Sequence, residues 1–248
     1  MVRVEFGRSD YSRTLKSQAA AASMAKFLYA PDSNRERHLR NFCSIIRVSY
    51  CWTILNYRAK LDKHFNLLRQ RKVKDARDEE YFNLVINLFG TCKSDEDIHN
   101  MRGLVTEYLI WQLCQINRIK GWSMRMGCTV TIDGHLVKVT DGDNSKKTVD
   151  VGAWFYSKSY GVFIESKVHP MSFHMIDAAY LEALRAELKK YKEITYRICL
   201  FSLDADGLME CRAAQEGYVI NDDTLIICED DIIDENKMFS IDVCGLLK

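Results

Sequence analysis

The stretch TVDVGAWFYSKSYGVFIESKV, residues 148–168, decides the expected fold, because it contains two apolar segments that each carry a carboxylate. Val, Ile, Phe and Trp dominate both segments, and residues of these types favour β-strands. The turn YSKSYG, residues 156–161, separates the segments. The sequence therefore predicts a hairpin with Asp150 on its first strand and with Glu165 and Lys167 on its second.

The relative placement of these side chains depends on where the turn is centred. Residues i and i+2 of a strand point to the same face, so Glu165 and Lys167 are presented together. A turn centred at residues 158–159 sets Asp150 opposite Lys167. Glu165 is then the diagonal neighbour of Asp150, at about 7–8 Å. A shift of the turn by half a step would move Asp150 to the other face and remove the site.

Two carboxylates that converge in an apolar sheet repel each other and are costly to desolvate, so we expect a cation between them. Mg²⁺ or Mn²⁺ suits an oxygen-only pair, because it keeps several waters and accepts phosphate oxygens. Lys167 can then hold or deprotonate the attacking water and offset charge in the transition state. The pattern predicts a phosphodiesterase site with Asp150 and Glu165 as metal ligands. The competing interpretation is an ordinary ion pair on a sheet surface.

Asp150, followed by Glu165-Ser166-Lys167 on the next strand, resembles the core motif of the PD-(D/E)xK, or restriction-endonuclease-like, nuclease superfamily. The expected order over about residues 96–203, a helix, a three-stranded meander, a helix and a strand, is similar to that fold. The resemblance implies an endonuclease that leaves a 5′-phosphate. It also implies a further metal-supporting glutamate from the helix before the meander. Glu107 is the candidate, because it lies within the apolar stripe of its helix.

The sequence departs from the family pattern at Val149, which stands where the family name has proline. It also contains two other ExK triplets, Glu187-Leu188-Lys189 and Glu235-Asn236-Lys237. The first falls in an expected helix, where residues i and i+2 diverge, and the second follows an acidic run. Only Glu165 is preceded by apolar strand residues and by an earlier strand that carries an aspartate.

Substrate and role stay open among several alternatives. The resemblance favours DNA over RNA, although cap-snatching RNA endonucleases share the core and also carry helices before it. A catalytically silent nucleic-acid-binding or assembly subunit of the same fold is the rival from another class. A third alternative is an unrelated α+β protein whose basic arm docks a partner. Related nucleases often cut duplexes as dimers, so a homodimer or a larger nucleoprotein assembly is a further expectation.

The first third of the 248-residue chain differs from the rest in charge and in expected structure. Residues 1–77 contain 17 Lys or Arg against 6 Asp or Glu, and residues 78–248 contain 18 against 28. Helical spacing of apolar residues predicts helices throughout the first 120 residues. We expect a basic helical region, 1–95, before an α+β core, 96–248, in which helices flank a mixed central sheet.

Arginines lie largely outside the apolar stripe of the helices expected after residue 33, which would give those helices a basic face. We expect four of them to contact nucleic-acid phosphates without reading sequence: Arg35, Arg37, Arg40 and Arg47. The alternative is a solvated, arginine-rich surface.

Local signals predict where the elements begin, turn and end. Ser33 and Glu36 have capping-box spacing, and Ser94 is a candidate N-cap. Asp133-Gly134 favours a type I′ hairpin turn. Further elements are expected as a helix within 171–193, a strand, turn and strand within 194–213, and a strand within 223–230.

Nine cysteines show no CxxC pair and lie singly in apolar runs, which indicates reduced thiols in a cytoplasmic or nuclear protein. No run of 18 uncharged apolar residues occurs, and the first 16 residues lack the apolar segment of a signal peptide. We therefore expect neither a membrane span nor a secretory signal.

Overall fold

The computed structural model describes residues 2–8, 15–69, 76–116, 121–204 and 207–234, and its internal contacts divide the chain into two compact units. The helical unit comprises residues 12–112. The sheet unit comprises residues 1–11 together with residues 113–248. The division falls within the helix Asp95–Ile116 rather than at residue 95.

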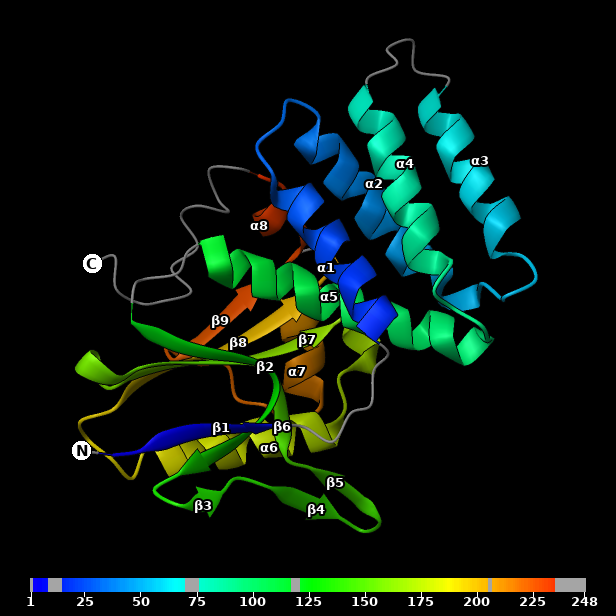
Figure 1. Cartoon of the computed structure of the whole chain (residues 1–248). Coiled ribbons are helices and arrows are strands. Elements are labelled where there is room, and N and C mark those ends of the chain that lie inside the picture. The colour runs from blue at the N-terminus through cyan, green and yellow to red at the C-terminus, as the bar shows by residue number, and fades with distance from the viewer. Residues whose placement is uncertain (1, 9–14, 70–75, 117–120, 205–206, 235–248) are drawn as a thin grey trace. The chain divides into compact units, whose positions relative to one another are not determined.

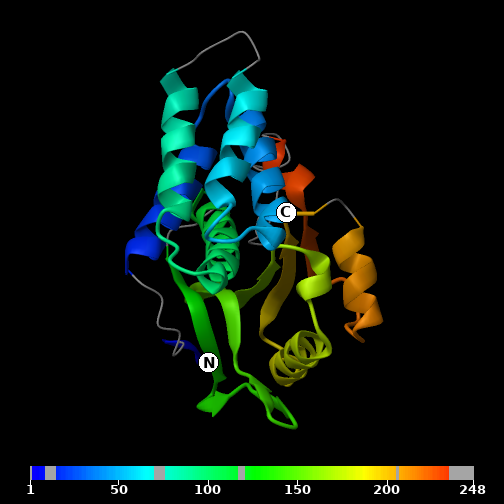
Figure 2. The ribbon, with the colours of Figure 1, turned by 90° about the vertical axis from the view of Figure 1, so that its right-hand side faces the viewer.

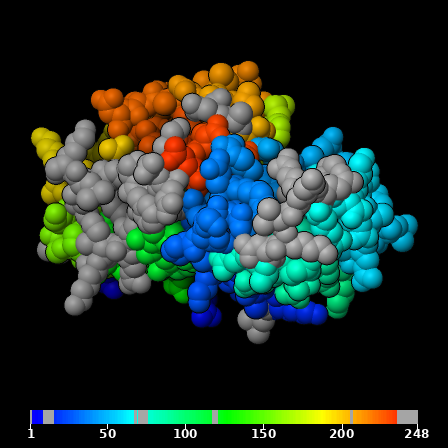
Figure 3. Space-filling model, turned by 90° about the horizontal axis from the view of Figure 1, so that it is seen from above, coloured from blue at the N-terminus to red at the C-terminus, as the bar shows by residue number. Residues whose placement is uncertain are grey.

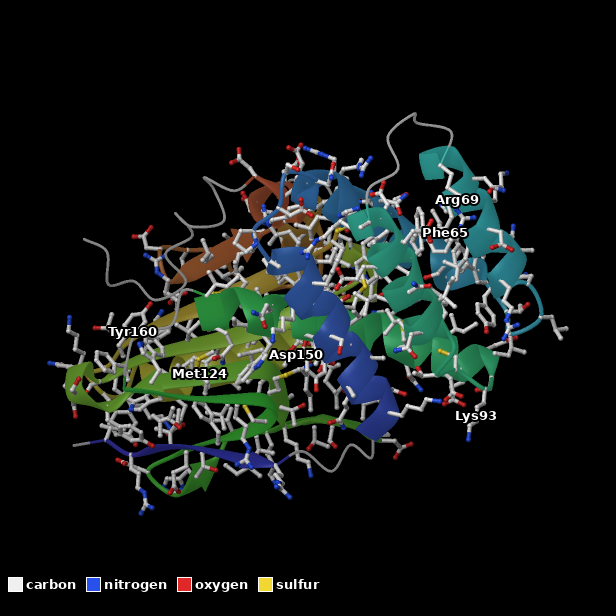
Figure 4. The ribbon with its side chains drawn as sticks, turned by 45° about the horizontal axis from the view of Figure 1, so that its top comes forward. Phe65, Arg69, Lys93, Met124, Asp150 and Tyr160 are labelled. Carbon is white, nitrogen blue, oxygen red and sulfur yellow. The ribbon has the colours of Figure 1, made fainter. Side chains whose placement is uncertain are left out.

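Helices make up the described part of the helical unit. They are α1 (Leu15–Tyr29), α2 (Arg35–Val48), the short 3-10 helix η1 (Ser49–Cys51), α3 (Tyr57–Arg69), α4 (Ala76–Phe89) and α5 (Asp95–Ile116), whose last residues belong to the sheet unit. Rings fill the core of this unit: the centroids of Phe65 and Phe82 are 4.5 Å apart, and His38 stacks on Tyr81 at 4.8 Å. Figure 4 shows Phe65 on α3.

The ends of these helices test two of the predicted caps. The Ser94 cap is confirmed, because Ser94 Oγ accepts the N–H of Asp97 at 3.1 Å. The capping box at Ser33 is wrong, since the N-cap of α2 is Asn34, which makes no capping hydrogen bond through its side chain. Asp32 explains the difference, because its carboxylate accepts both the Asn34 N–H and the Ser33 hydroxyl.

A mixed sheet forms the centre of the sheet unit (Figure 1). Its strands, in spatial order, are β1 (Val4–Arg8), β2 (Trp122–Ile132), β6 (Thr148–Phe155), β7 (Tyr160–Lys167), β8 (Thr195–Ser202) and β9 (Thr224–Ile227). Pairing is antiparallel from β1 to β7 and parallel from β7 to β9. The short β3 (His135–Leu136) pairs with β2. The protein therefore belongs to the α+β class, as the sequence predicts.

Smaller elements surround this sheet. They are the hairpin of β4 (Val139–Asp141) and β5 (Asn144–Lys146), the 3-10 helices η2 (Tyr156–Lys158) and η3 (Pro170–Ser172), and the helices α6 (Met175–Leu188), α7 (Leu208–Gln215) and α8 (Glu229–Ile233). Leu181 and Leu184 of α6 share a buried apolar cluster with Phe163 of β7 and Leu200 of β8. Figure 2 shows α6, in yellow, nearly end-on beside the β4–β5 hairpin. The face of the sheet that carries Phe163 is thus covered by α6.

Three further predictions have clear outcomes. The Asp133-Gly134 turn is confirmed, with φ of 46° and 82° between the paired residues Ile132 and His135. An all-helical first 120 residues is wrong, because β1 pairs along β2. A second strand within 194–213 is also wrong, because α7 begins at Leu208, after Gly207 with φ of 79°.

Candidate functional site

The turn between β6 and β7 is centred one residue earlier than predicted. Val151 pairs with Ile164, and Phe155 pairs with Tyr160. Residues 156–159 close the hairpin, and Ser159 adopts φ of 48°. A shift of the turn by a full step leaves each side chain on its predicted face of the sheet. Asp150 is therefore not moved to the other face, as a half-step shift would have done. The prediction that Asp150 lies opposite Lys167 is wrong, however. One position beyond the pair of Val151 and Ile164, the register places Glu165 opposite Asp150.

Asp150 is tied directly to the motif on β7. Asp150 Oδ2 accepts the backbone N–H of Ser166 at 2.7 Å and the Ser166 hydroxyl at 2.8 Å. The continuous pairing of β6 with β2 is interrupted opposite Asp150, at Gly127, where φ is 48°. Figure 4 labels Asp150 on the sheet. The carboxylate that the sequence places on one strand is therefore positioned by the middle residue of the ExK triplet on the next.

Glu165 is the centre of a four-residue charge cluster. Its side chain is 1% exposed, and its Oε1 atom accepts from Lys146 Nζ at 2.7 Å and from Lys167 Nζ at 2.8 Å. Asp177 completes the cluster: its carboxylate lies 2.7 Å from Lys146 Nζ and 3.1 Å from Lys167 Nζ. Each lysine thus bridges the same two carboxylates. Glu165 and Lys167 share a face, as predicted.

Lys146 and Asp177 are site residues that the sequence reasoning missed. Lys146 ends β5 of the inserted hairpin, and Asp177 lies in the first turn of α6, where it also accepts the backbone N–H of His174 at 2.9 Å. Neither residue lies on the strand of Glu165, so the alternation of side chains along that strand does not predict that they are close to it. A signal in the sequence was available for Asp177, because an acidic residue stands early in the helix that follows the ExK strand. Such a helix packs back on the sheet and can bring this residue to the side chains of that strand.

The pKa values of the cluster follow from burial and from these contacts. Burial raises the pKa of Glu165, against the opposing effect of the two ammonium groups. Burial also favours neutral amines, yet the adjacent carboxylates, Glu165 first, hold the pKa values of Lys146 and Lys167 above their usual range. The two lysines outweigh burial at Asp177 and lower its pKa. Lys167 is therefore a cationic hydrogen-bond donor, and of the two roles predicted for it this favours the offsetting of charge over the removal of a proton from water.

The residues present fit one predicted mode of metal binding. Among the described residues, no group of three or more His, Cys, Asp or Glu side chains is arranged to hold an ion. Mg²⁺ needs only one or two protein carboxylates, because waters and phosphate oxygens complete its shell. Glu165 Oε2 is buried with no hydrogen-bond partner in the described part of the chain. Such an oxygen is costly to leave bare, and a cation ligated by Glu165 and Asp150 would satisfy it.

One further predicted site residue, Glu107, lies in the helical unit. Glu107 is buried on α5, with 6% of its surface exposed, and α5 directly precedes β2, the first of the strands that lead to β6 and β7. The triplet at Glu187 lies at the end of α6, as predicted, while Glu235 falls outside the described residues.

The four predicted phosphate-binding arginines differ in exposure. Arg35 is 5% exposed, with its guanidinium 5.8 Å from the ring centroid of Tyr29, so it is not part of a basic surface. Arg37 pairs with Asp78. Arg40 is largely exposed and pairs with Glu36, and Arg47 is half-buried. Figure 3 shows atoms of this unit, in blue to cyan, at the surface of the face in view.

Comparison with known proteins assigns no family. A scan against models of protein families finds no match, and a search of curated proteins finds none at a significant level. None of the helices in the described ranges combines the length and the apolar character needed to cross a lipid bilayer.

Proposed function

We propose that this chain is a Mg²⁺- or Mn²⁺-dependent nuclease that hydrolyses phosphodiester bonds, with DNA favoured over RNA and internal cleavage over cleavage from ends. One observation carries the proposal. Asp150, Glu165 and Lys167 converge on adjacent strands, and a buried oxygen of Glu165 lacks a partner within the described residues. Buried, clustered ionisable groups with an unsatisfied ligand atom are more typical of a reactive site than of a packed core.

The order of elements supports the same proposal. Helix α5 is followed by the antiparallel strands β2, β6 and β7, by α6, and by β8, which is parallel to β7. The PD-(D/E)xK resemblance implies this order, with the acidic residue on the second strand of the meander and the ExK triplet on the third. Asp150 on β6 and Glu165 on β7 match those positions.

The proposed roles follow from the contacts. Asp150 and Glu165 would hold the ion, which would neutralise the bound phosphate and acidify a ligated water. Ser166 orients Asp150 through its N–H and hydroxyl. Lys167, held by Glu165 and Asp177, would donate to the phosphate or the attacking water and offset the negative charge that develops there. The PD-(D/E)xK resemblance implies a further metal-supporting glutamate from the preceding helix, and Glu107 of α5 stays the predicted residue for that role.

Arg40 and Arg47 are proposed to contact the phosphate backbone of the nucleic acid. Both lie on α2, where the Arg40 side chain is largely exposed and Arg47 is half-buried. Arginines at the surface contribute sequence-independent affinity, which suits an enzyme that must first bind the phosphate backbone.

A second candidate function, a catalytically silent nucleic-acid-binding or assembly subunit, is favoured by a different observation. Lys146 and Lys167 already neutralise Glu165 and Asp177. A cluster in which the charges already offset one another can serve stability alone, without a metal.

A cleavage assay separates these two candidates. Purified protein is incubated with supercoiled DNA, linear DNA and single-stranded RNA, each in EDTA, Mg²⁺ or Mn²⁺. We expect metal-dependent cleavage that EDTA abolishes and that Glu165→Gln lowers by about 10²-fold or more. Glu187→Gln is the matched control, because Glu187 also precedes a lysine by two residues but pairs with Lys190 at the end of α6. Equal activity of wild type and Glu165→Gln under every condition would refute the nuclease proposal.

A further inference from the structure

Lys146 occupies a bridging position between two acidic side chains from different elements. Its Nζ atom lies 2.7 Å from Glu165 Oε1 on β7 and 2.7 Å from Asp177 Oδ1 on α6. A cation that touches one oxygen of each of two carboxylates has the position that a bridging metal ion takes in a two-ion site. Lys146 comes from neither strand of the predicted motif.

The β4–β5 hairpin holds this lysine in place. Lys146 pairs with Val139 across the hairpin, and Val139 packs against the buried apolar cluster that includes Leu181 and Leu184 of α6. Only 16% of the Lys146 side chain is exposed. Its ammonium group is thus anchored at the base of the hairpin, and the carboxylates keep its pKa above the usual range.

The net charge of the cluster favours the binding of one divalent ion rather than two. Asp150, Glu165 and Asp177 carry three negative charges when ionised, and two positive charges come from Lys146 and Lys167. One divalent ion changes the net charge from −1 to +1, which a single phosphodiester group balances. A second divalent ion would leave a large excess of positive charge at a site with little access to water, and such an excess is strongly disfavoured.

We propose that Lys146 is a built-in cation that takes the place of a second divalent ion between Glu165 and Asp177, so that the site binds a single ion. Asp150 and the unpartnered Oε2 atom of Glu165 would hold that ion. The inference rests on the proposed metal-dependent function and names how many ions that function uses. It also assigns a role to the hairpin: to deliver a fixed positive charge to the bound phosphate.

Titration with MnCl₂, followed by the electron paramagnetic resonance signal of free Mn²⁺, tests this assignment without an activity measurement. Wild type is expected to bind one ion, and Lys146→Ala two. Mn²⁺ should also raise the melting temperature of Lys146→Ala more than that of wild type, since it replaces the missing cation between Glu165 and Asp177. Lys138→Ala is the control, because Lys138 is an exposed lysine next to the same hairpin and should leave the stoichiometry at one. Lys146→Gln keeps a hydrogen-bond donor without charge and repeats the measurement if the alanine variant does not fold.

The outcomes distinguish this inference from the proposed function. Two ions on wild type, or one ion with unchanged affinity on both Lys146 variants, overturn the role of Lys146 and leave the nuclease proposal standing. No bound Mn²⁺ on wild type or on any variant overturns both.

Discussion

The backbone N–H of Ser166 donates to Asp150 Oδ2 at 2.7 Å, and the Ser166 hydroxyl donates to the same oxygen at 2.8 Å. The middle residue of the ExK triplet therefore fixes the acidic residue of the neighbouring strand. Ser166 is only 9% exposed, so water does not readily replace these two hydrogen bonds.

Ser166→Ala should loosen Asp150, because the N–H bond survives while the hydroxyl bond is lost. We expect Mn²⁺ affinity to fall about 5- to 10-fold, equivalent to a hydrogen bond of about 1 kcal/mol to a charged group. Isothermal titration calorimetry measures this change. Ser166→Thr keeps the hydroxyl and should retain most of the affinity. Equal losses in the two variants would show that packing at this position matters rather than the hydroxyl bond.

Asp177→Asn should destabilise the fold. The substitution removes one of the two negative charges that Lys146 and Lys167 share, while Asp177 is only 4% exposed. Removing a partner from a buried charged network costs on the order of 1–3 kcal/mol when other partners remain. Urea denaturation measures the free energy of unfolding. Asp222→Asn, at an exposed position, is the control and should lie within about 0.5 kcal/mol of wild type.

Alkylation by iodoacetamide at pH 8 should distinguish buried from exposed cysteines. Burial raises the pKa values of Cys43 and Cys128 to about 12, so about one thiol in ten thousand is ionised at that pH. Cys51 and Cys211 are exposed and should be modified first. Peptide mass spectrometry of the native and urea-unfolded protein reports each site. Rapid modification of Cys128 in the native protein would contradict its complete burial on β2.

Simultaneous replacement of Arg40 and Arg47 by alanine should weaken nucleic-acid binding and flatten its salt dependence. Each lost phosphate contact lowers the slope of log K against log salt by about 0.9 for a duplex. Fluorescence anisotropy with labelled DNA at several salt concentrations gives that slope. Lys93→Ala, an exposed charge elsewhere in the same unit, is the control. An unchanged slope in the double variant would exclude the proposed phosphate contacts.

The periodicity of apolar residues predicted most of the helices and strands, because the spacing that forms them is set by residues close together in the sequence. The helices of the first unit, the Asp133-Gly134 turn and the strands around Asp150 and Glu165 follow spacing that neighbouring residues impose. The strand β1 was missed although Val2, Val4 and Phe6 alternate with polar residues, because a short strand at a chain end is stabilised only by its distant partner β2. The Leu208 helix was missed because its apolar residues suit either periodicity over so short a length.

Only part of the candidate site was predicted, because only the part formed by residues close together in the sequence follows from local spacing. Glu165 and Lys167 share a strand, so parity places them together. Lys146 and Asp177 enter the cluster through the β4–β5 hairpin and α6, and only tertiary packing brings them to Glu165. Arg35 shows the converse, since its position in the helix suggested exposure while the contact with Tyr29 buries it.

The single-turnover cleavage rate of Lys167→Ala, measured at a Mn²⁺ concentration that saturates the protein, tests the proposed chemistry most directly. Lys167 contacts Glu165 and Asp177 and offers no oxygen to an ion, so the variant should bind Mn²⁺ at least as tightly as wild type. Its cleavage rate should fall by about 10²-fold or more, because the charge that offsets the transition state is gone. Cleavage at the wild-type rate by a correctly folded, Mn²⁺-saturated Lys167→Ala protein would contradict the assignment of this cluster as the catalytic site.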